Sequence, residues 1–347
     1  MLFGARKREA PGMTLEGVLA PNGRLDAAPG MAVERPDALC VAGDGRLLYS
    51  SANRICRLDG WGGAPETWST FETAITALCA GPDGLVAAGL SGGGLAVLDP
   101  VGRPVDGWSA PAGLRSVVDC LFTSGDEIVL VDCGYGPGED VLAMAPWEEA
   151  GRGQVVAVSR ASAARLVAEG LPCPMGICGR GDDGSLFVTE LEQARIVDLA
   201  GQVRQSGYPG YPGRLRKTAG GYVMACLARR DPLIEFLKTE KAFVAEMKAA
   251  IEPRHWISPR SRPEFSHDFP IELGATRLFG EIKPWAPSFS YGLVIELDDA
   301  LMPVASAHSR ANGRRHDISD VVSWQGELIA VSRASGEILN LGSGTAP

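Results

Sequence analysis

The chain repeats one short unit, and this repeat leaves few folds open to it. Two clear copies span residues 37–49 and 76–86, and each contains a short apolar run, an Asp-Gly turn and a second apolar run. This arrangement is the short-range signature of a β-hairpin. Weaker copies follow, so that six units are countable, with turn glycines at Gly45, Gly84, Gly125, Gly184, Gly221 and Gly326.

The spacing of the repeat predicts the architecture. Successive turn glycines are 39, 41, 59, 37 and 105 residues apart. A step near 40 residues is what one four-stranded blade of a β-propeller needs. A third strand is expected after the first two hairpins, over residues 54–58 and 94–98. We therefore expect an all-β chain in which residues 1–347 form one six-bladed β-propeller domain, with an insertion in each of the two long steps.

The longer step predicts an insertion over residues 231–287 in the fifth blade. Asp231 is a good N-cap, and the proline that follows it suits the first helical position. Apolar residues then recur at intervals of three and four, which indicates one amphipathic helix over 231–251. The stretch 253–287 is interpreted as an ordered lid loop, with the blade resuming over 291–297. We expect this insertion to cap the mouth of the central tunnel.

Composition and charge limit the cellular location and the binding partners that we expect for the chain. The formal net charge is −9, which offers no basic face for a nucleic-acid backbone. An 18-residue apolar run is missing from the sequence, as is a secretory signal, so we expect neither a membrane span nor export, and a cytoplasmic location. The eight cysteines form no Cys-x-x-Cys pair and lie in apolar runs, which favours reduced, buried side chains.

Several segments, taken in order, resemble one branch of the six-bladed propellers. They are 131–135, 208–212, 231–233, 291–297 and 318–326. These segments resemble the strictosidine-synthase-like branch, which is related to the gluconolactonase and paraoxonase enzymes. The resemblance covers the chain from about Pro36 to Leu341.

The resemblance implies a particular kind of site. The hydrolytic members of this superfamily hold a divalent cation, usually calcium, over the central tunnel with acidic and Asn or Asp side chains. Oxygen ligands of this kind suit a hard ion. In this sequence Asp37 keeps a carboxylate, whereas Met175, Gly213 and Arg214 fall on the other positions and supply no oxygen side chain. We therefore expect no catalytic metal and no other cofactor, with Arg214 projecting into the tunnel near Asp37 and Asp119, although bound calcium stays open.

The same matching bears on the chemistry of the parent synthase. Its catalytic Glu falls on Ser319, and a hydroxyl cannot take over the work of a carboxylate base near neutral pH without help. True strictosidine synthesis is therefore not expected.

Candidate site residues follow from the resemblance and from the residue types. For catalysis they are His308 and His316, both placed at the entry to the sixth blade, and Asp119; histidine is the readiest acid or base near pH 7. A loop or core role for each histidine stays open. The candidate ligand-binding residues are Asp37, Met175, Arg214, Ser319, Arg315 and Glu190.

Two functions remain open from the sequence. One is an enzyme that acts on a small polar molecule at the tunnel, with lactone or ester hydrolysis as the expected reaction. The other is a non-catalytic ligand-binding or protein-interaction propeller that has lost the catalytic metal. Arginines such as Arg214 and Arg315 would suit a ligand carboxylate or phosphate. The oligomeric state is not indicated.

Overall fold

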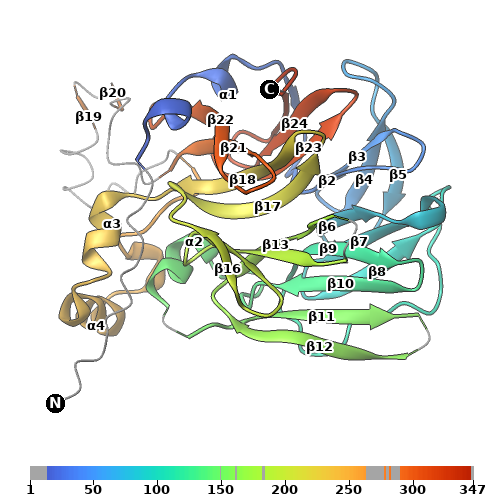
Figure 1. Cartoon of the computed structure of the whole chain (residues 1–347), viewed down its shortest axis with the longest axis horizontal. Helices are drawn as coiled ribbons and strands as arrows, with labels where there is room; N and C mark the ends of the chain where they lie inside the picture. The colour runs from blue at the N-terminus through green and yellow to red at the C-terminus, as the bar shows by residue number, and fades with distance from the viewer. Residues whose placement is uncertain are drawn as a thin grey trace.

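Six small antiparallel sheets are arranged in a ring (Figure 1). The computed structural model describes residues 14–148, 150–160, 162–181, 184–262, 277–278, 281–282 and 290–344. Five of these sheets have four strands, and the sheet of the second blade along the chain has three. This arrangement confirms the predicted six-bladed β-propeller.

The first three blades use the chain up to residue 171. Blade 1 contains β2 (Leu39–Val41), β3 (Leu47–Ser51), β4 (Arg54–Leu58) and β5 (Glu66–Thr70). Blade 2 contains β6 (Ile75–Ala80), β7 (Val86–Leu90) and β8 (Gly94–Leu98). Blade 3 contains β9 (Val117–Ser124), β10 (Glu127–Asp132), β11 (Gly153–Ser159) and β12 (Ser162–Leu171). The predicted third strands over 54–58 and 94–98 are confirmed as β4 and β8.

The other three blades follow in chain order, except for one strand. Blade 4 contains β13 (Pro174–Gly179), β14 (Leu186–Glu190), β15 (Arg195–Asp198) and β16 (Val203–Ser206). Blade 5 contains β17 (Gly210–Thr218), β18 (Gly221–Arg229), β21 (Gly292–Leu297) and β22 (Pro303–Ser309). Blade 6 contains β23 (Ile318–Trp324), β24 (Glu327–Ser332), β25 (Glu337–Asn340) and the early strand β1 (Gly30–Ala32).

Each predicted hairpin joins the first and second strands of one blade. The first strands β2, β6, β9, β13, β17 and β23 are the inner strands, and each contacts the inner strand of the next blade around the ring. Turn glycines such as Gly45 and Gly326 have φ values of 84° and 80°, a backbone region that glycine adopts without steric cost. The repeated hairpin turn therefore marks the same end of the tunnel in every blade.

The ring is closed by strands from near the two ends of the chain. β1 pairs antiparallel with β25. Arg315 reinforces this junction, because its guanidinium donates to both carboxylate oxygens of Glu337 at 3.0 and 3.1 Å and to the carbonyl oxygen of Leu25 at 2.8 Å. Leu25 lies in α1 (Arg24–Ala27), which follows the short helix η1 (Gly17–Leu19). Closure of this kind leaves only short strand edges.

Both long steps of the repeat contain insertions, as predicted, and both insertions include helices, although a helix was predicted only in the longer one. Between β10 and β11 lie α2 (Val141–Met144) and η3 (Ala145–Trp147). Between β18 and β21 lie α3 (Pro232–Leu237), α4 (Lys241–Ala250), η4 (Pro253–His255), β19 (Arg277–Leu278) and β20 (Glu281–Ile282). A further short helix, η2 (Pro82–Gly84), forms the turn of blade 2. Most of the expected lid loop over 253–287 lies outside the described residues.

The two insertions pack against each other. They share an apolar cluster whose members include Trp147, Ile234, Met247 and Trp256. Ser258 adds a polar link, because its hydroxyl accepts from the Trp147 indole and donates to the carbonyl oxygen of residue 143, both at 2.7 Å. Figure 1 shows α2, α3 and α4 gathered on the same side of the ring.

The prediction of one helix over 231–251 is wrong, because two helices occupy this range. Asp231 caps α3 as expected and accepts from the N–H of Leu233 at 2.8 Å. Thr239 then lies at the break, where its hydroxyl donates to the carbonyl oxygen of Phe236 at 2.7 Å. A side chain that bonds the local backbone in this way competes with the helical pattern.

The break also divides the predicted apolar face. Val244 and Met247 are buried, whereas Phe236 is 58% exposed and Ile251 is 40% exposed. A continuous helix would have aligned these side chains in one stripe. Two short helices in different directions do not.

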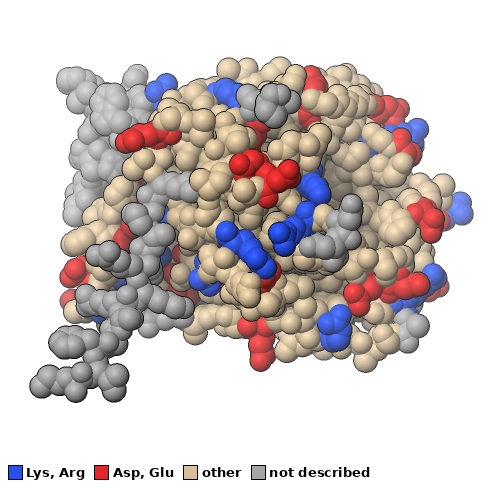
Figure 2. Space-filling view, in the orientation of Figure 1, with Lys and Arg blue, Asp and Glu red and all other residues tan. Residues whose placement is uncertain are grey.

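One face of the molecule carries charges of both signs. On the side drawn in Figure 2, acidic and basic side chains are interspersed. Among the described helices, none is long and apolar enough to cross a membrane.

All eight cysteines are buried and free, which confirms the prediction made for them.

We expect Arg315→Gln to destabilise the fold by about 3 kcal/mol, because it leaves partly buried Glu337 and several carbonyl groups without their partner. Urea unfolding followed by circular dichroism measures the change. Arg314→Gln is the matched control, since Arg314 is the adjacent residue and is exposed. Equal stability of the two variants would contradict a closing role for Arg315.

Candidate ligand site in the central tunnel

One arginine gathers the starts of four inner strands. Arg214 lies on β17 and is 4% exposed. Its guanidinium donates to the carbonyl oxygens of Asp37 at 2.7 Å, Val118 at 2.9 Å and Ser319 at 3.1 Å. It also donates to the carbonyl oxygen of Thr76. These acceptors belong to blades 1, 3, 6 and 2, so the side chain lies on the tunnel axis.

Three carboxylates surround the same guanidinium. The shortest approaches from Arg214 are 3.2 Å to Asp37, 3.7 Å to Asp320 and 3.9 Å to Asp119. The structure thus places Arg214 beside Asp37 and Asp119, as predicted from the sequence. We call Arg214 and its carbonyl and carboxylate partners the arginine plug.

A second arginine lies directly beside the plug. Arg216 donates to the two oxygens of Asp119 at 2.8 and 2.9 Å and to Asp320 at 3.1 Å. Burial alone would lower the pKa of Arg216, but Asp119 and Asp320 hold this pKa well above its usual value. Burial raises the pKa of Asp320, and the two arginines oppose that rise. The Arg216 guanidinium therefore stays charged and paired.

Backbone amides complete the shell of both buried aspartates. Asp119 accepts from the N–H of Cys120 at 3.0 Å and of Ile177 at 2.9 Å. Asp320 accepts in the same way from its following residue and from Leu39 in the next blade, at 2.9 and 3.0 Å. Both side chains are fully buried. Asp119 therefore has no free oxygen with which to act on a substrate.

The sequence did not lead to Asp320 or Arg216 as candidate site residues, although the repeat contains a signal for Asp320. Asp119 and Asp320 each lie six residues before a turn glycine, Gly125 and Gly326. They occupy equivalent positions in two blades, so the repeat itself relates them. Arg216 carries no comparable signal, because its role depends on the separation of two blades across the tunnel.

The plug does not suit a divalent cation. The resemblance implies calcium at this point, held by oxygen ligands. Here a permanent positive charge occupies the centre, and the nearby carboxylate and carbonyl oxygens already accept hydrogen bonds from it. Within the described residues, no group of three or more His, Cys, Asp or Glu side chains is placed to hold a metal ion. We derive no metal-dependent step.

The tunnel mouth beside Asp37 carries a further ion pair. Arg333 donates to the two oxygens of Asp317 at 2.7 and 3.0 Å and lies 3.8 Å from Asp37. Burial raises the pKa of Asp317, and Arg333 opposes the rise. The side chains of Asp37 and Arg333 are 20% and 34% exposed. This mouth is therefore polar and reachable by water.

The two candidate catalytic histidines lie in the packed interior. His308 is on β22, the outermost strand of blade 5, which corrects its predicted placement at the entry to blade 6. Its ring bonds the Tyr291 hydroxyl at 3.1 Å and the Ser306 hydroxyl at 2.9 Å. His316 precedes β23, where it bonds the Ser290 hydroxyl at 2.9 Å and the carbonyl oxygen of Arg310 at 2.8 Å. Both rings are fully buried.

Burial also depresses the basicity of these rings. It lowers the pKa of His308 to about 4, assisted by the positive charges of Arg229 and Arg310. Burial lowers the pKa of His316 as well. Neutral, satisfied rings of this kind agree with the core role that the sequence left open. Their catalytic role stays a prediction.

The remaining candidates are distributed over several blades. Ser319 belongs to the plug, and its hydroxyl donates to the carbonyl oxygen of Asp37 at 2.7 Å. Met175 lies near the start of β13 in an apolar cluster that also contains the inserted helix α2. Glu190 ends β14 and pairs with Arg195, while Arg315 closes blade 6. The structure therefore brings together Asp37, Asp119, Arg214 and Ser319 only.

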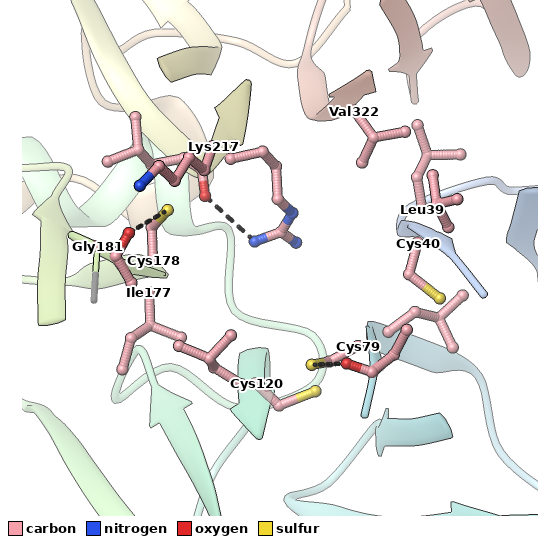
Figure 3. A pocket seen from close by; sticks show the side chains of 16 residues that line it. Leu39, Cys40, Cys79, Cys120, Ile177, Cys178, Gly181, Lys217 and Val322 are labelled. Atoms are coloured by element: carbon pink, nitrogen blue, oxygen red, sulfur yellow. Dashed lines mark hydrogen bonds between the residues drawn. The ribbon is translucent and has the colours of Figure 1, made fainter. Parts of the chain in front are cut away.

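A cavity of about 440 Å³ opens further along the inner strands, toward the hairpin turns (Figure 3). Its walls are mainly apolar side chains and thiols. They include Leu39, Leu78, Leu121, Ile177, Leu215, Val322, Cys40, Cys79, Cys120 and Cys178. Among the described residues that line it, the charged side chains are Arg216 and Lys217. The volume is that of a small-molecule pocket.

Comparisons with known proteins agree on the fold. No family model matches the sequence, and no curated protein matches it. One similar solved structure is a candidate gluconolactonase, with a TM-score of 0.50 and 12% identity over 92% of this chain and 95% of that one. Another is a candidate oxidoreductase (glucose dehydrogenase) from Thermus thermophilus, with a TM-score of 0.50 and 14% identity over 90% and 99%. The chain thus has the propeller fold found in gluconolactonase-like and glucose dehydrogenase-like proteins.

We expect Arg214→Met to destabilise the protein by about 3 to 5 kcal/mol, because buried carboxylates and carbonyls lose their shared partner. Urea unfolding gives the free energy. Arg204→Met removes an exposed ion pair with Asp198 and should cost about 1 kcal/mol or less. A similar small loss in both variants would rule out the plug as a stabilising centre.

His308 should make stability depend on pH. Because its pKa is 6.5 when unfolded and about 4 when folded, the unfolded chain binds the proton more readily. The contribution of the neutral His308 ring to the free energy of unfolding is fully present above about pH 6.5. It falls by about 3 kcal/mol as the pH drops toward 4. Urea unfolding across this range should show a shallower acid loss in His308→Gln than in the wild type. His255→Gln serves as the control, and an unchanged slope in His308→Gln would count against the buried neutral ring.

Proposed function

We propose that the chain is a small-molecule-binding propeller and that its ligand occupies the tunnel cavity beside the arginine plug. The observation that carries this proposal is the plug. Arg214 fills the tunnel centre with a fixed charge that is already paired to Asp37 and to several carbonyl groups. A site of this kind does not need a metal ion and has no place for one.

The cavity supplies what a binding site requires. Apolar walls bury most of a small ligand, while a few polar groups fix its orientation. Here Arg216 and Lys217 provide the positive charge, and the lining residues that the structure describes include no carboxylate. A molecule with an apolar body and one anionic group fits this chemistry best.

Lactone or ester hydrolysis, the reaction expected from the sequence, receives less support. Water attack needs a base with a free lone pair, or a metal that lowers the pKa of water. The oxygens of Asp119 are held by Arg216 and by backbone amides, and the two histidines are buried in hydrogen bonds away from the described cavity lining. The similarity to a candidate gluconolactonase, at 12% identity, concerns the fold.

Binding can be tested with 1-anilinonaphthalene-8-sulfonate, an aromatic sulfonate. We expect saturable fluorescence with one site per native chain. Leu121→Trp should abolish it by filling the cavity, whereas Val101→Trp, at a position 63% exposed, should not. Equal binding by both variants would place the probe elsewhere and contradict the cavity as the site.

The hydrolase alternative needs its own assay. Hydrolysis of δ-gluconolactone and of p-nitrophenyl acetate should show no calcium-dependent rate above a heat-denatured control. A calcium-dependent rate that Asp37→Asn abolishes would restore metal-assisted hydrolysis and overturn the proposal.

A further inference from the structure

Four inner strands each contribute one thiol to the wall of the tunnel cavity. Cys40, Cys79, Cys120 and Cys178 belong to blades 1, 2, 3 and 4 and occupy the same position of the repeat. Cysteine packs well as a small apolar residue, so burial alone does not distinguish them. Two of the four stand apart by their contact with each other.

Cys79 and Cys120 form a pair across the junction of blades 2 and 3. The Cys79 thiol donates to the carbonyl oxygen of Ala80 at 3.3 Å, and the Cys120 thiol lies 4.0 Å from the carbonyl oxygen of Ala87, the strand partner of Cys79. Figure 3 shows the two sulfur atoms next to each other, with that of Cys40 further away. The inner strands that carry them, β6 and β9, are in close contact along the tunnel.

The two sulfurs are not equivalent. The Cys79 sulfur accepts the backbone N–H of Phe122 at 3.4 Å, a bond that stabilises a negative charge. The neighbouring Cys120 thiol lowers the pKa of Cys79; burial opposes this, and the Phe122 amide and the charge of Arg216 reinforce it. The neighbouring Cys79 thiol, together with burial, raises the pKa of Cys120. By contrast, burial raises the pKa of Cys178 to about 11.

Thiol oxidation uses such a pair, in which one cysteine has a lower pKa than the cysteine beside it. The thiolate is the reactive form, and a reactive cysteine is commonly placed next to a resolving cysteine. Cys79 is the more exposed of the two, at 7% against 2%, and both border a cavity large enough to admit small oxidants.

We propose that Cys79 and Cys120 are a peroxide-sensitive thiol pair that forms a disulfide between blades 2 and 3. The Cys79 thiolate attacks one oxygen of hydrogen peroxide, the O–O bond breaks, and a sulfenic acid and hydroxide form. The Cys120 thiol then attacks the Cys79 sulfur, the S–O bond breaks, and the oxygen leaves as water. Overall, two thiols and one peroxide give one disulfide and two waters.

The pair is independent of the proposed ligand function, because the reaction needs only the two thiols and peroxide. The disulfide would nevertheless form in the cavity wall. Oxidation would therefore fix two neighbouring inner strands to each other at the place where a ligand would bind.

The test treats the native full-length chain with hydrogen peroxide, blocks the remaining thiols with N-ethylmaleimide, and maps peptides under non-reducing conditions. We expect the wild type to lose two of its eight free thiols and to yield one linked peptide pair containing Cys79 and Cys120. The mass should fall by two hydrogens, and dithiothreitol should reverse the change.

Variants separate the two roles. Cys79→Ser should form neither the disulfide nor a sulfenic acid, whereas Cys120→Ser should stop at a sulfenic acid on Cys79 that dimedone labels. Cys178→Ser is the matched control, from the same cavity and the same position of the repeat, and should still form the bond. Circular dichroism confirms that each variant is folded.

Any of three results would overturn the inference. One is full retention of all eight thiols at peroxide levels that oxidise a free low-pKa thiol. Another is oxidation at cysteines other than this pair, and the third is a disulfide that persists in Cys79→Ser.

Discussion

One buried cation, Arg214, joins the inner strands of this propeller at the tunnel axis. Six inner strands converge on a narrow tunnel, and residues at the starts of four of them direct carbonyl oxygens toward its centre. Each such group must find a donor or remain unsatisfied at a high cost. Arg214 supplies donors to strands of four blades from one planar group. A guanidinium suits this task because its donors diverge in fixed directions and its charge is permanent.

The burial of the Arg214 guanidinium requires the carboxylates that surround it. A buried arginine is tolerated only when opposite charge lies close to it. Asp119 and Asp320 lie at equivalent positions of two blades, and Arg216 bridges them. Each aspartate also accepts a backbone amide of the next blade, so the charged cluster joins neighbouring blades as well as balancing the tunnel. The repeat that builds the blades thus also builds the cluster.

Much of this could be predicted from the sequence, and the limit has a physical cause. The Asp-Gly hairpins recur locally, so blade number, inner strands and the place of each insertion could be predicted. The position of Arg214 beside Asp37 also followed, because the family resemblance matches both residues to positions that face the tunnel. The break at Thr239 could not be predicted from apolar spacing, which continues across it. Neither could the burial of His308, because its partners Tyr291 and Ser306 are defined by strand pairing within blade 5.

The cluster also separates the tunnel into two chemical environments. At the end where the inner strands begin, Asp37, Asp317 and Arg333 form a polar, partly exposed mouth. At the hairpin end, apolar side chains and thiols surround the cavity, and Arg216, which lies beside the plug, lines it. A ligand in the cavity would therefore meet the charge of an arginine whose own carboxylates lie behind it. Whatever binds there is recognised by shape and apolar contact first, because Arg216 already directs its strongest hydrogen bonds to Asp119 and Asp320.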